Sequence, residues 1–325
     1  MSRNHSTLLL LIVLVPVVFL VSLSVGSVHV STGDLISLLL SEPATQETQV
    51  ISELRLPRSL GAFTCGALLA LSGVLMQVLL RNPLADPYVL GVSGGAAVAT
   101  LLAMLSGAGG FMLTGSAFLG SLISMLLVFG IAQMQGSWSP TRLLLTGVVI
   151  AAGWGALISL ILSISPDRNI HSMLFWLMGD LSYVNMVWPG ILVLIFCTLT
   201  TLAGARQLNV LLHGDLQASA LGINIKKLRL TLYVVASILT ATAVTIAGTV
   251  GFVGLIVPHL VRLTGITDHR WLIPNSILLG GTLLLVADTF ARTVIAPNQL
   301  PVGVIMAIIG VPLFLILLHR SNRSL

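Results

Sequence analysis

The sequence predicts an all-α membrane protein that crosses the bilayer about ten times. Of its 325 residues, 56% are apolar and only 8% are charged, whereas a soluble domain carries about 25% charged residues. Apolar runs recur along the whole chain, and many approach the roughly 20 residues that a spanning helix needs. Lys and Arg gather in alternate loops, as the positive-inside rule requires. We expect one transmembrane domain over residues 1–325.

Ten apolar segments are candidate spans. They lie at 8–27, 59–80, 90–106, 111–133, 142–164, 187–205, 229–248, 251–265, 273–291 and 302–318. The first resembles a signal peptide, but it is long enough to span and no small-residue cleavage site precedes Val28, which favours a membrane helix. Shorter segments with glycines are typical of helices that neighbouring helices surround.

Two further segments are predicted to form short surface helices on the outer side. Residues 31–40 begin with Ser31 and Thr32, residue types that cap helix N-termini. Residues 169–178 combine Asn169 and His171 with apolar residues. We expect both to lie along the membrane surface.

The distribution of basic residues predicts the orientation. With a cytoplasmic N-terminus and ten spans, eleven of the fifteen bases fall in inner loops. The remaining four, Arg55, Arg58, Arg168 and Arg292, fall on the outer side. One helix more or fewer would spoil this bias, so both termini are expected in the cytoplasm. The bases are scattered between apolar runs, which argues against nucleic-acid binding.

Catalytic signatures are absent from the sequence. It contains no HExxH, no GxSxG in a nucleophile elbow and no Walker A motif. If ATP drives the protein, another chain must bind it. Asp288 is the only acid in a predicted span and lies near one end, which argues against an ion-coupled carrier. Cys65 and Cys197 lie in apolar runs without a metal-binding pattern.

Arg55, Arg58 and Arg292 are the first candidate functional residues, because bases are disfavoured on the outer side. Asp288 and Arg292 form an i,i+4 pair that compensates part of the charge. The arginines either snorkel to the headgroups or form a basic patch that receives carboxylates of a soluble partner.

The inner loops contain the other candidates. In the loop at 206–228, a short helix is expected from Asp215 to a C-capping Gly222; it is either a docking surface or an ordinary structured loop. Residues 82–87 contain two prolines and predict a non-helical turn. The glycines that follow, Gly91, Gly94 and Gly95, indicate either close helix packing or a narrow passage.

Motifs spread from about residue 50 to 320 resemble the FecCD family, the permease subunits of ATP-driven importers for iron–siderophores, haem and vitamin B12. In chain order they are Arg55-Leu-Pro-Arg58, Gly73-Val-Leu-Met-Gln77, Asn82-Pro-Leu-Ala-Asp-Pro87, Leu90-Gly-Val-Ser-Gly94, Arg142-Leu-Leu-Leu-Thr-Gly147, Phe175-Trp-Leu-Met-Gly179, Gly251-Phe-Val-Gly-Leu-Ile-Val-Pro-His259, Asp268-His-Arg270, Ala287-Asp288, Leu300-Pro-Val-Gly303 and Gly310-Val-Pro312. So long a set in one order is highly specific, and it looks especially like the vitamin B12 permease.

The resemblance implies a type II ABC importer permease in a bacterial inner membrane. It implies a second permease copy, as a homodimer or pseudo-dimer, two ATP-binding subunits below and a periplasmic substrate-binding protein above. ATP and Mg are then expected in the ATPase subunits, and this chain is expected to hold no cofactor and no metal. It would be a transport subunit and not an enzyme.

The resemblance also implies roles for individual residues. Arg55, Arg58 and Arg292 match outward arginines that meet glutamates of the binding protein. Asn82 and Leu84 match a cytoplasmic gate, and Pro140 and Thr141 fall at a second inner constriction, where Pro140 replaces the family's small hydroxyl residue. The segment that matches the ATPase-coupling helices is Asp215, Leu216, Gln217, Ala218, Ser219, Ala220, Leu221 and Gly222; Asp215 replaces the more usual Glu.

We therefore expect a permease subunit that moves a metal chelate, either iron–siderophore or haem, or vitamin B12, from periplasm to cytoplasm by alternating access. Iron-chelate members are the more numerous, which favours an iron chelate as the cargo. The alternatives are a stand-alone secondary carrier of a small organic solute and an intramembrane enzyme. The first would need an acid at the midplane, and the second a His, Ser or paired-acid site within the bilayer.

Overall fold

The computed structural model describes residues 3–26, 46–134, 139–182, 184 and 186–321. In these residues the regular structure is helical. The elements are α1 (Arg3–Ser24), α3 (Gln46–Gln49), η1 (Val50–Arg55), α4 (Leu56–Leu79), η2 (Pro87–Leu90), α5 (Val92–Leu105), α6 (Phe111–Gln133), α7 (Pro140–Ile164), α8 (Asp167–Leu177), α9 (Trp188–Ala203), α10 (Ala205–Leu212), α11 (Asp215–Ala220), α12 (Ile225–Ala247), α13 (Val253–Leu263), α14 (His269–Ala291) and α15 (Val302–Ser321).

Each predicted apolar segment overlaps one of these helices. Six helices in the described part are long and apolar enough to cross a membrane: α1, η1 with α4, α6, α7, α12 and α14. A seventh is α9 with α10, which bend by 60° at Gly204, while α5, α13 and α15 are apolar but shorter. A multi-pass α-helical fold is confirmed, and the count of ten crossings stays a prediction.

Of the two predicted surface helices, one lies in the described part of the chain. Residues 169–178 fall almost entirely in α8, an amphipathic helix, as expected. The segment at 31–40 lies outside the described residues.

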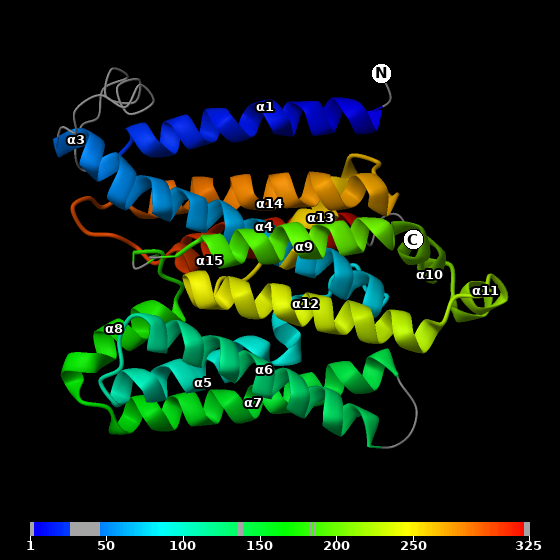
Figure 1. Cartoon of the computed structure of the whole chain (residues 1–325), viewed down its shortest axis with the longest axis horizontal. Helices are drawn as coiled ribbons and strands as arrows, with labels where there is room; N and C mark the ends of the chain where they lie inside the picture. The colour runs from blue at the N-terminus through cyan, green and yellow to red at the C-terminus, as the bar shows by residue number, and fades with distance from the viewer. Residues whose placement is uncertain (1–2, 27–45, 135–138, 183, 185, 322–325) are drawn as a thin grey trace.

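The long helices lie side by side along the longest axis of the molecule (Figure 1). At one end lie α3, α8 and the start of α4; at the other lie α10, α11 and both chain termini. The termini therefore share an end with the loop that carries α11. We call these the α8 end and the α11 end.

Helix α4 forms the centre of the bundle and is almost completely buried. The glycines of α4 allow such close packing, because without a side chain they let the backbone of α4 touch the backbones of α13 and α14. A Cβ on Gly66 would lie 2.2 Å from the carbonyl oxygen of Gly280 in α14, and one on Gly73 would lie 1.9 Å from that of Gly254 in α13. Contacts this close are typical of small residues in membrane helices.

Helices α1 and α7 lie at the periphery and expose most of their apolar surface. On α7 the exposed side chains include Leu145, Val149, Leu160 and Ile164. A surface of this kind is unfavourable in water but matches lipid or a second membrane subunit.

The glycines at the start of α5 serve close packing. A Cβ on Gly95 would lie 2.4 Å from the carbonyl oxygen of Gly120 in α6, and one on Gly94 would lie 2.7 Å from Cβ of Trp154 in α7. Of the two interpretations of this sequence, close packing is the one that the contacts support.

Candidate functional site

At the α8 end, Arg58 and Asp288 form the central ion pair. Arg58 Nε donates to both carboxylate oxygens at 3.0 Å, and its Nη2 donates to Oδ1 at 2.8 Å. The Asp288 side chain is completely buried, whereas that of Arg58 is 12% exposed. Because an unpaired buried carboxylate is costly, Arg58 holds the end of α14 against the start of α4.

Arg58 also binds groups outside this pair. Its Nη1 donates to Oε1 of Gln299 at 2.5 Å and to Oγ of Ser182 at 3.3 Å. The guanidinium of Arg58 thus links α4 and α14 to the two connecting segments that contain Ser182 and Gln299.

Arg292 and Arg55 hold the end of α1. Arg292 donates to the carbonyl and, at 2.7 Å, to Oγ of Ser22. Arg55 Nη1 donates to the carbonyls of Leu23 and Ser24 at 2.6 and 3.1 Å. The last carbonyls of a helix have no partner within it, so both arginines act as C-terminal caps of α1.

The predicted pair of Asp288 and Arg292 is present, with 3.9 Å between Oδ2 and Nε. The structure thus brings the three predicted arginines together around Asp288 and the end of α1. Arg55 and Arg292 are only 5% and 8% exposed, so in this conformation they hold the chain together, and Arg58 is the most accessible. A docking role for the three stays a prediction.

At the α11 end, the residues expected from Asp215 to Gly222 form the short helix α11 and the turn after it. Gly214 and Gly222, on either side, have φ angles of 122° and 79°, a region that favours glycine. Ala218 is buried, whereas Leu216 and Leu221 are 89% and 69% exposed. The exposed residues between them are Gln217, Ser219 and Ala220.

Asp215 fastens α11 to the bundle. Its two carboxylate oxygens accept from Arg229 Nη2 at 3.0 and 2.9 Å, which ties α11 to the second turn of α12. Oδ1 also accepts from Arg81, which lies just beyond the end of α4. One carboxylate at the start of α11 therefore joins α4, α11 and α12.

The predicted gate residue Asn82 follows Arg81 directly. Its Oδ1 accepts from the amide of Leu84 at 2.9 Å and its carbonyl accepts from that of Ala85 at 3.0 Å, so residues 82–85 form a compact turn with Pro83 inside it and Pro87 after it. Asn82 is exposed and Leu84 is half-buried. The ion pair of Asp215 therefore reaches the residue next to the predicted gate.

Pro140 and Thr141 open α7 after the N-cap Ser139. Pro140 is half-buried and Thr141 is exposed. Within the described residues, no hydrogen bond joins them to Asn82 or Leu84. Proline is common at the first position of a helix. The presence of Pro140 at the start of α7 is therefore explained without a role in gating.

A second cluster supports the loop from the side of α10. Asn209 donates from Nδ2 to Oδ1 of Asp268 at 2.7 Å, and its own Oδ1 accepts from the backbone amide and Nδ1 of His269 at 3.0 and 2.6 Å. Asp268 caps α14 by accepting from the amide of Arg270 at 2.9 Å. That hydrogen bond, and to a lesser degree the one from Asn209, lowers the pKa of Asp268.

Sequence reasoning missed Arg81 and Arg229 as site residues and treated them only as topology signals. Arg81 and Asp215 are 134 residues apart, so no local spacing connects them. In the part of the chain that the structure covers, no group of three His, Cys, Asp or Glu side chains is placed to hold a metal ion.

Comparison with known proteins decides the family. The profile of the FecCD transport family matches residues 11–320. The chain belongs to the FecCD transport family. Among its FecCD relatives is the hemin transport system permease HmuU of Yersinia pestis, 39% identical over 94% of this chain and 95% of the relative. The vitamin B12 import system permease BtuC of Salmonella schwarzengrund is 37% identical over 99% of this chain and 97% of the relative.

A solved structure agrees with the family. It is an inward-facing conformation of a metal-chelate type ABC transporter, 32% identical, with a TM-score of 0.86 over 97% of this chain and 99% of that one. The resemblance drawn from the motifs is therefore confirmed, and the chain is an ABC transporter permease of the FecCD family.

Proposed function

We propose that this FecCD permease imports a metal chelate from periplasm to cytoplasm by alternating access. Hemin and vitamin B12 are the cargoes that the relatives' names give, and the structural neighbour is of metal-chelate type. An iron–siderophore belongs to the same cargo class. In the proposal the α8 end faces the periplasm, and the α11 end and both termini lie in the cytoplasm of a bacterium, with about ten crossings of the inner membrane.

The chain works in a larger assembly in this proposal. A second permease copy covers part of the exposed apolar surface, two ATP-binding subunits with ATP and Mg dock at the α11 end, and a periplasmic binding protein docks at the α8 end. Arg58, Arg55 and Arg292 receive its carboxylates, with Arg58 as the first contact because it is the most accessible of the three. Asn82, Leu84, Pro140 and Thr141 form the inner gate.

The observation that carries the proposal is the ion pairing of Asp215. An ATPase subunit that binds the exposed Leu216 of α11 and Leu221 just after it would displace Asp215. Asp215 in turn binds Arg81, the neighbour of the gate residue Asn82. The pair with Arg229 carries the same displacement into α12. Helix α11 has only six residues, and among the described residues its side-chain hydrogen bonds to the rest of the bundle are those of Asp215. These ion pairs are therefore its firmest connection to the bundle.

The test uses the permease reconstituted in vesicles with its ATPase and binding protein. Uptake of hemin, vitamin B12 or a ferric siderophore is measured together with ATP hydrolysis. We expect uptake only with ATP and the binding protein. Uptake driven by an ion gradient without ATP would contradict the proposal and favour a secondary carrier.

Coupling is tested by Asp215→Asn, which keeps the shape but removes the charge. We expect ATP hydrolysis to continue while the number of cargo molecules moved per ATP falls about tenfold. A tenfold change lies within the range that typical coupling free energies between two sites produce. Ser219→Ala, also on α11, is the control and should transport normally. Normal coupling in Asp215→Asn would remove the ion pairs from the mechanism but leave the importer assignment intact.

A further inference from the structure

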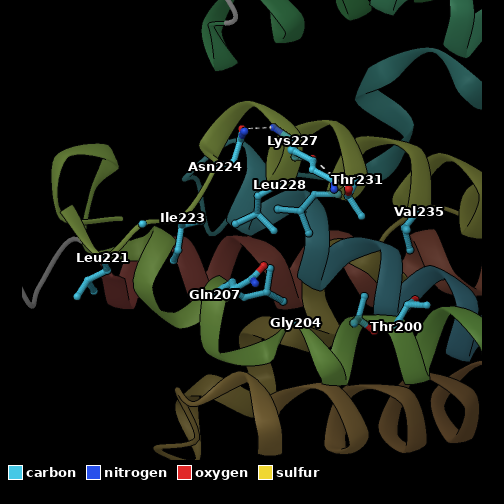
Figure 2. Close-up of a pocket in the computed structure, with 14 residues that line it drawn as sticks. Thr200, Gly204, Gln207, Leu221, Ile223, Asn224, Lys227, Leu228, Thr231 and Val235 are labelled. Carbon is cyan, nitrogen blue, oxygen red and sulfur yellow. Dashed lines mark hydrogen bonds between the residues drawn. The ribbon is translucent and has the colours of Figure 1, made fainter. Parts of the chain in front are cut away.

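A groove opens at the α11 end between the helix pair α9–α10 and helix α12 (Figure 2). Its volume is about 460 Å³. Thr200, Gly204 and Gln207 form one wall, the segment after α11 closes one end, and the N-terminal half of α12 forms the other wall. Leu221 and Gly222, which belong to the segment expected to contact the ATPase, line one end of it; the functions described above do not use the rest of the groove.

The wall formed by α12 changes from charged to apolar along its length. Lys227, Thr231 and Val235 line the groove at intervals of four residues, so they lie one above another on a single face of the helix. Eight residues of α-helix span about 12 Å. The lysine lies at the α11 end, and the valine lies two turns further along the apolar helix α12.

The threonines do not make the deep part of the groove polar. Thr201 Oγ1 donates to the carbonyl of Cys197 at 2.6 Å, and Thr231 Oγ1 donates to that of Lys227 at 3.0 Å. Because these hydroxyl hydrogens are used within their own helices, the deep walls offer mainly methyl groups together with Leu228, Leu232 and Val235.

The shallow part of the groove is positively charged. Its 14 lining residues include Lys227 and no acid. Among the described residues the ammonium group of Lys227 forms no salt bridge, since the acid in this region, Asp215, pairs with Arg81 and Arg229. Lys227 lies in the first turn of α12, whose N-terminus adds a partial positive charge.

We propose that this groove binds an anionic phospholipid of the inner leaflet. Its phosphate lies against Lys227 and the first turn of α12, and one acyl chain follows the wall from Thr231 to Val235. A protein partner that docks on α11 can cover the shallow part, but the deep part lies at the level of the acyl chains. A free anion would use the lysine and leave the apolar walls empty, so the combination fits a lipid.

The full-length chain is purified in mild detergent and titrated with dioleoylphosphatidylglycerol or dioleoylphosphatidylcholine, which share their acyl chains. Native mass spectrometry counts the bound lipids. We expect tighter binding of the anionic lipid. Lys227→Gln should weaken it about fivefold, the contribution of one lysine at an anionic membrane surface. Lys226→Gln is the matched control: this exposed neighbour does not line the groove and should bind as the wild type does.

Thr231→Trp tests the apolar part, because the indole fills the groove next to α9. It should reduce binding of both lipids, while Lys227→Gln affects only the anionic one. Equal losses in Lys227→Gln and Lys226→Gln, or equal binding of the two lipids by the wild type, would overturn the proposal. Displacement of the lipid by an excess of inorganic phosphate would also overturn it, since the groove would then be a free-anion site.

Discussion

Asp288 is a buried carboxylate near the end of a membrane helix, and Arg58 makes its burial possible. The pair uses three hydrogen bonds of 2.8 to 3.0 Å, with Arg292 further away at 3.9 Å. Removing one partner of a buried ion pair leaves the other charge unpaired, while replacing both with apolar residues is often neutral.

Arg58→Met should therefore lower the free energy of unfolding by roughly 3 kcal/mol. The double variant Arg58→Met/Asp288→Leu should recover most of that loss. Thermal unfolding of the purified chain in detergent measures both. If Arg58→Met were as stable as the wild type, the ion pair of Arg58 and Asp288 would not contribute to stability.

The same double variant separates folding from docking. If Arg58 receives a carboxylate of the binding protein, the restored double variant should still bind that protein more weakly, and the remaining binding should depend less on salt. Arg168→Gln, an exposed arginine of α8 at the same end, is the control. Unchanged docking in Arg58→Met/Asp288→Leu would confine Arg58 to a structural role.

At the level of elements, α11 is a six-residue helix that exposes a leucine at the α11 end of the molecule. Leu216 is 89% exposed on a helix whose other side is closed by the buried Ala218. Leu216→Gln should weaken binding of the ATPase subunit about tenfold, the effect of losing a central apolar contact, without changing stability. Leu212→Gln, an exposed leucine of α10, should bind normally. A co-purification assay with the ATPase compares them.

The cap of α14 predicts a pH dependence. Hydrogen bonds lower the pKa of Asp268 below its usual 3.8 in the folded chain, so the stabilisation is present above that value and is lost as the pH falls through the lowered pKa. Asp268→Ala should cost about 1 kcal/mol at neutral pH, and the deficit should shrink below about pH 4. Unfolding at several pH values checks this, with Asp268→Asn as the variant that keeps a capping side chain.

The apolar helices could be predicted from the sequence because a long apolar segment is a local property, and about 20 such residues suffice to span a membrane. The number of crossings stays a prediction. The pair of Asp288 and Arg292 was predictable for the same reason, since four residues make one helical turn. The pairing of Arg81 with Asp215 was not, because it depends on how α4 and the loop before α12 meet in space. The burial of Arg55 and Arg292 was missed because both bind the end of α1, through its carbonyls and the hydroxyl of Ser22, and no local sequence pattern reveals contacts this far apart in the chain.

At the level of the whole molecule, α4 connects the two functional ends. It begins beside Arg58 and ends beside Arg81, so one helix links the predicted docking surface to the ion pairs of Asp215. Gly73→Ala should strain this link, because a Cβ there would lie 1.9 Å from the carbonyl oxygen of Gly254. We expect a loss of about 2 kcal/mol in stability, measured by thermal unfolding. Gly115→Ala in α6, where a Cβ meets open space, is the control.

The glycine contacts of α4 also have a mechanical consequence. Helices that interlock through side chains must lift ridges out of grooves, or change rotamers, before one can slide along the other. At Gly73, α4 meets only backbone atoms of Gly254 in α13, whereas at Gly66 the side chain of Leu284 in α14 lies beside the backbone contact with Gly280. At these two glycines, a small displacement of α13 along α4 therefore meets fewer side chains than the same displacement of α14.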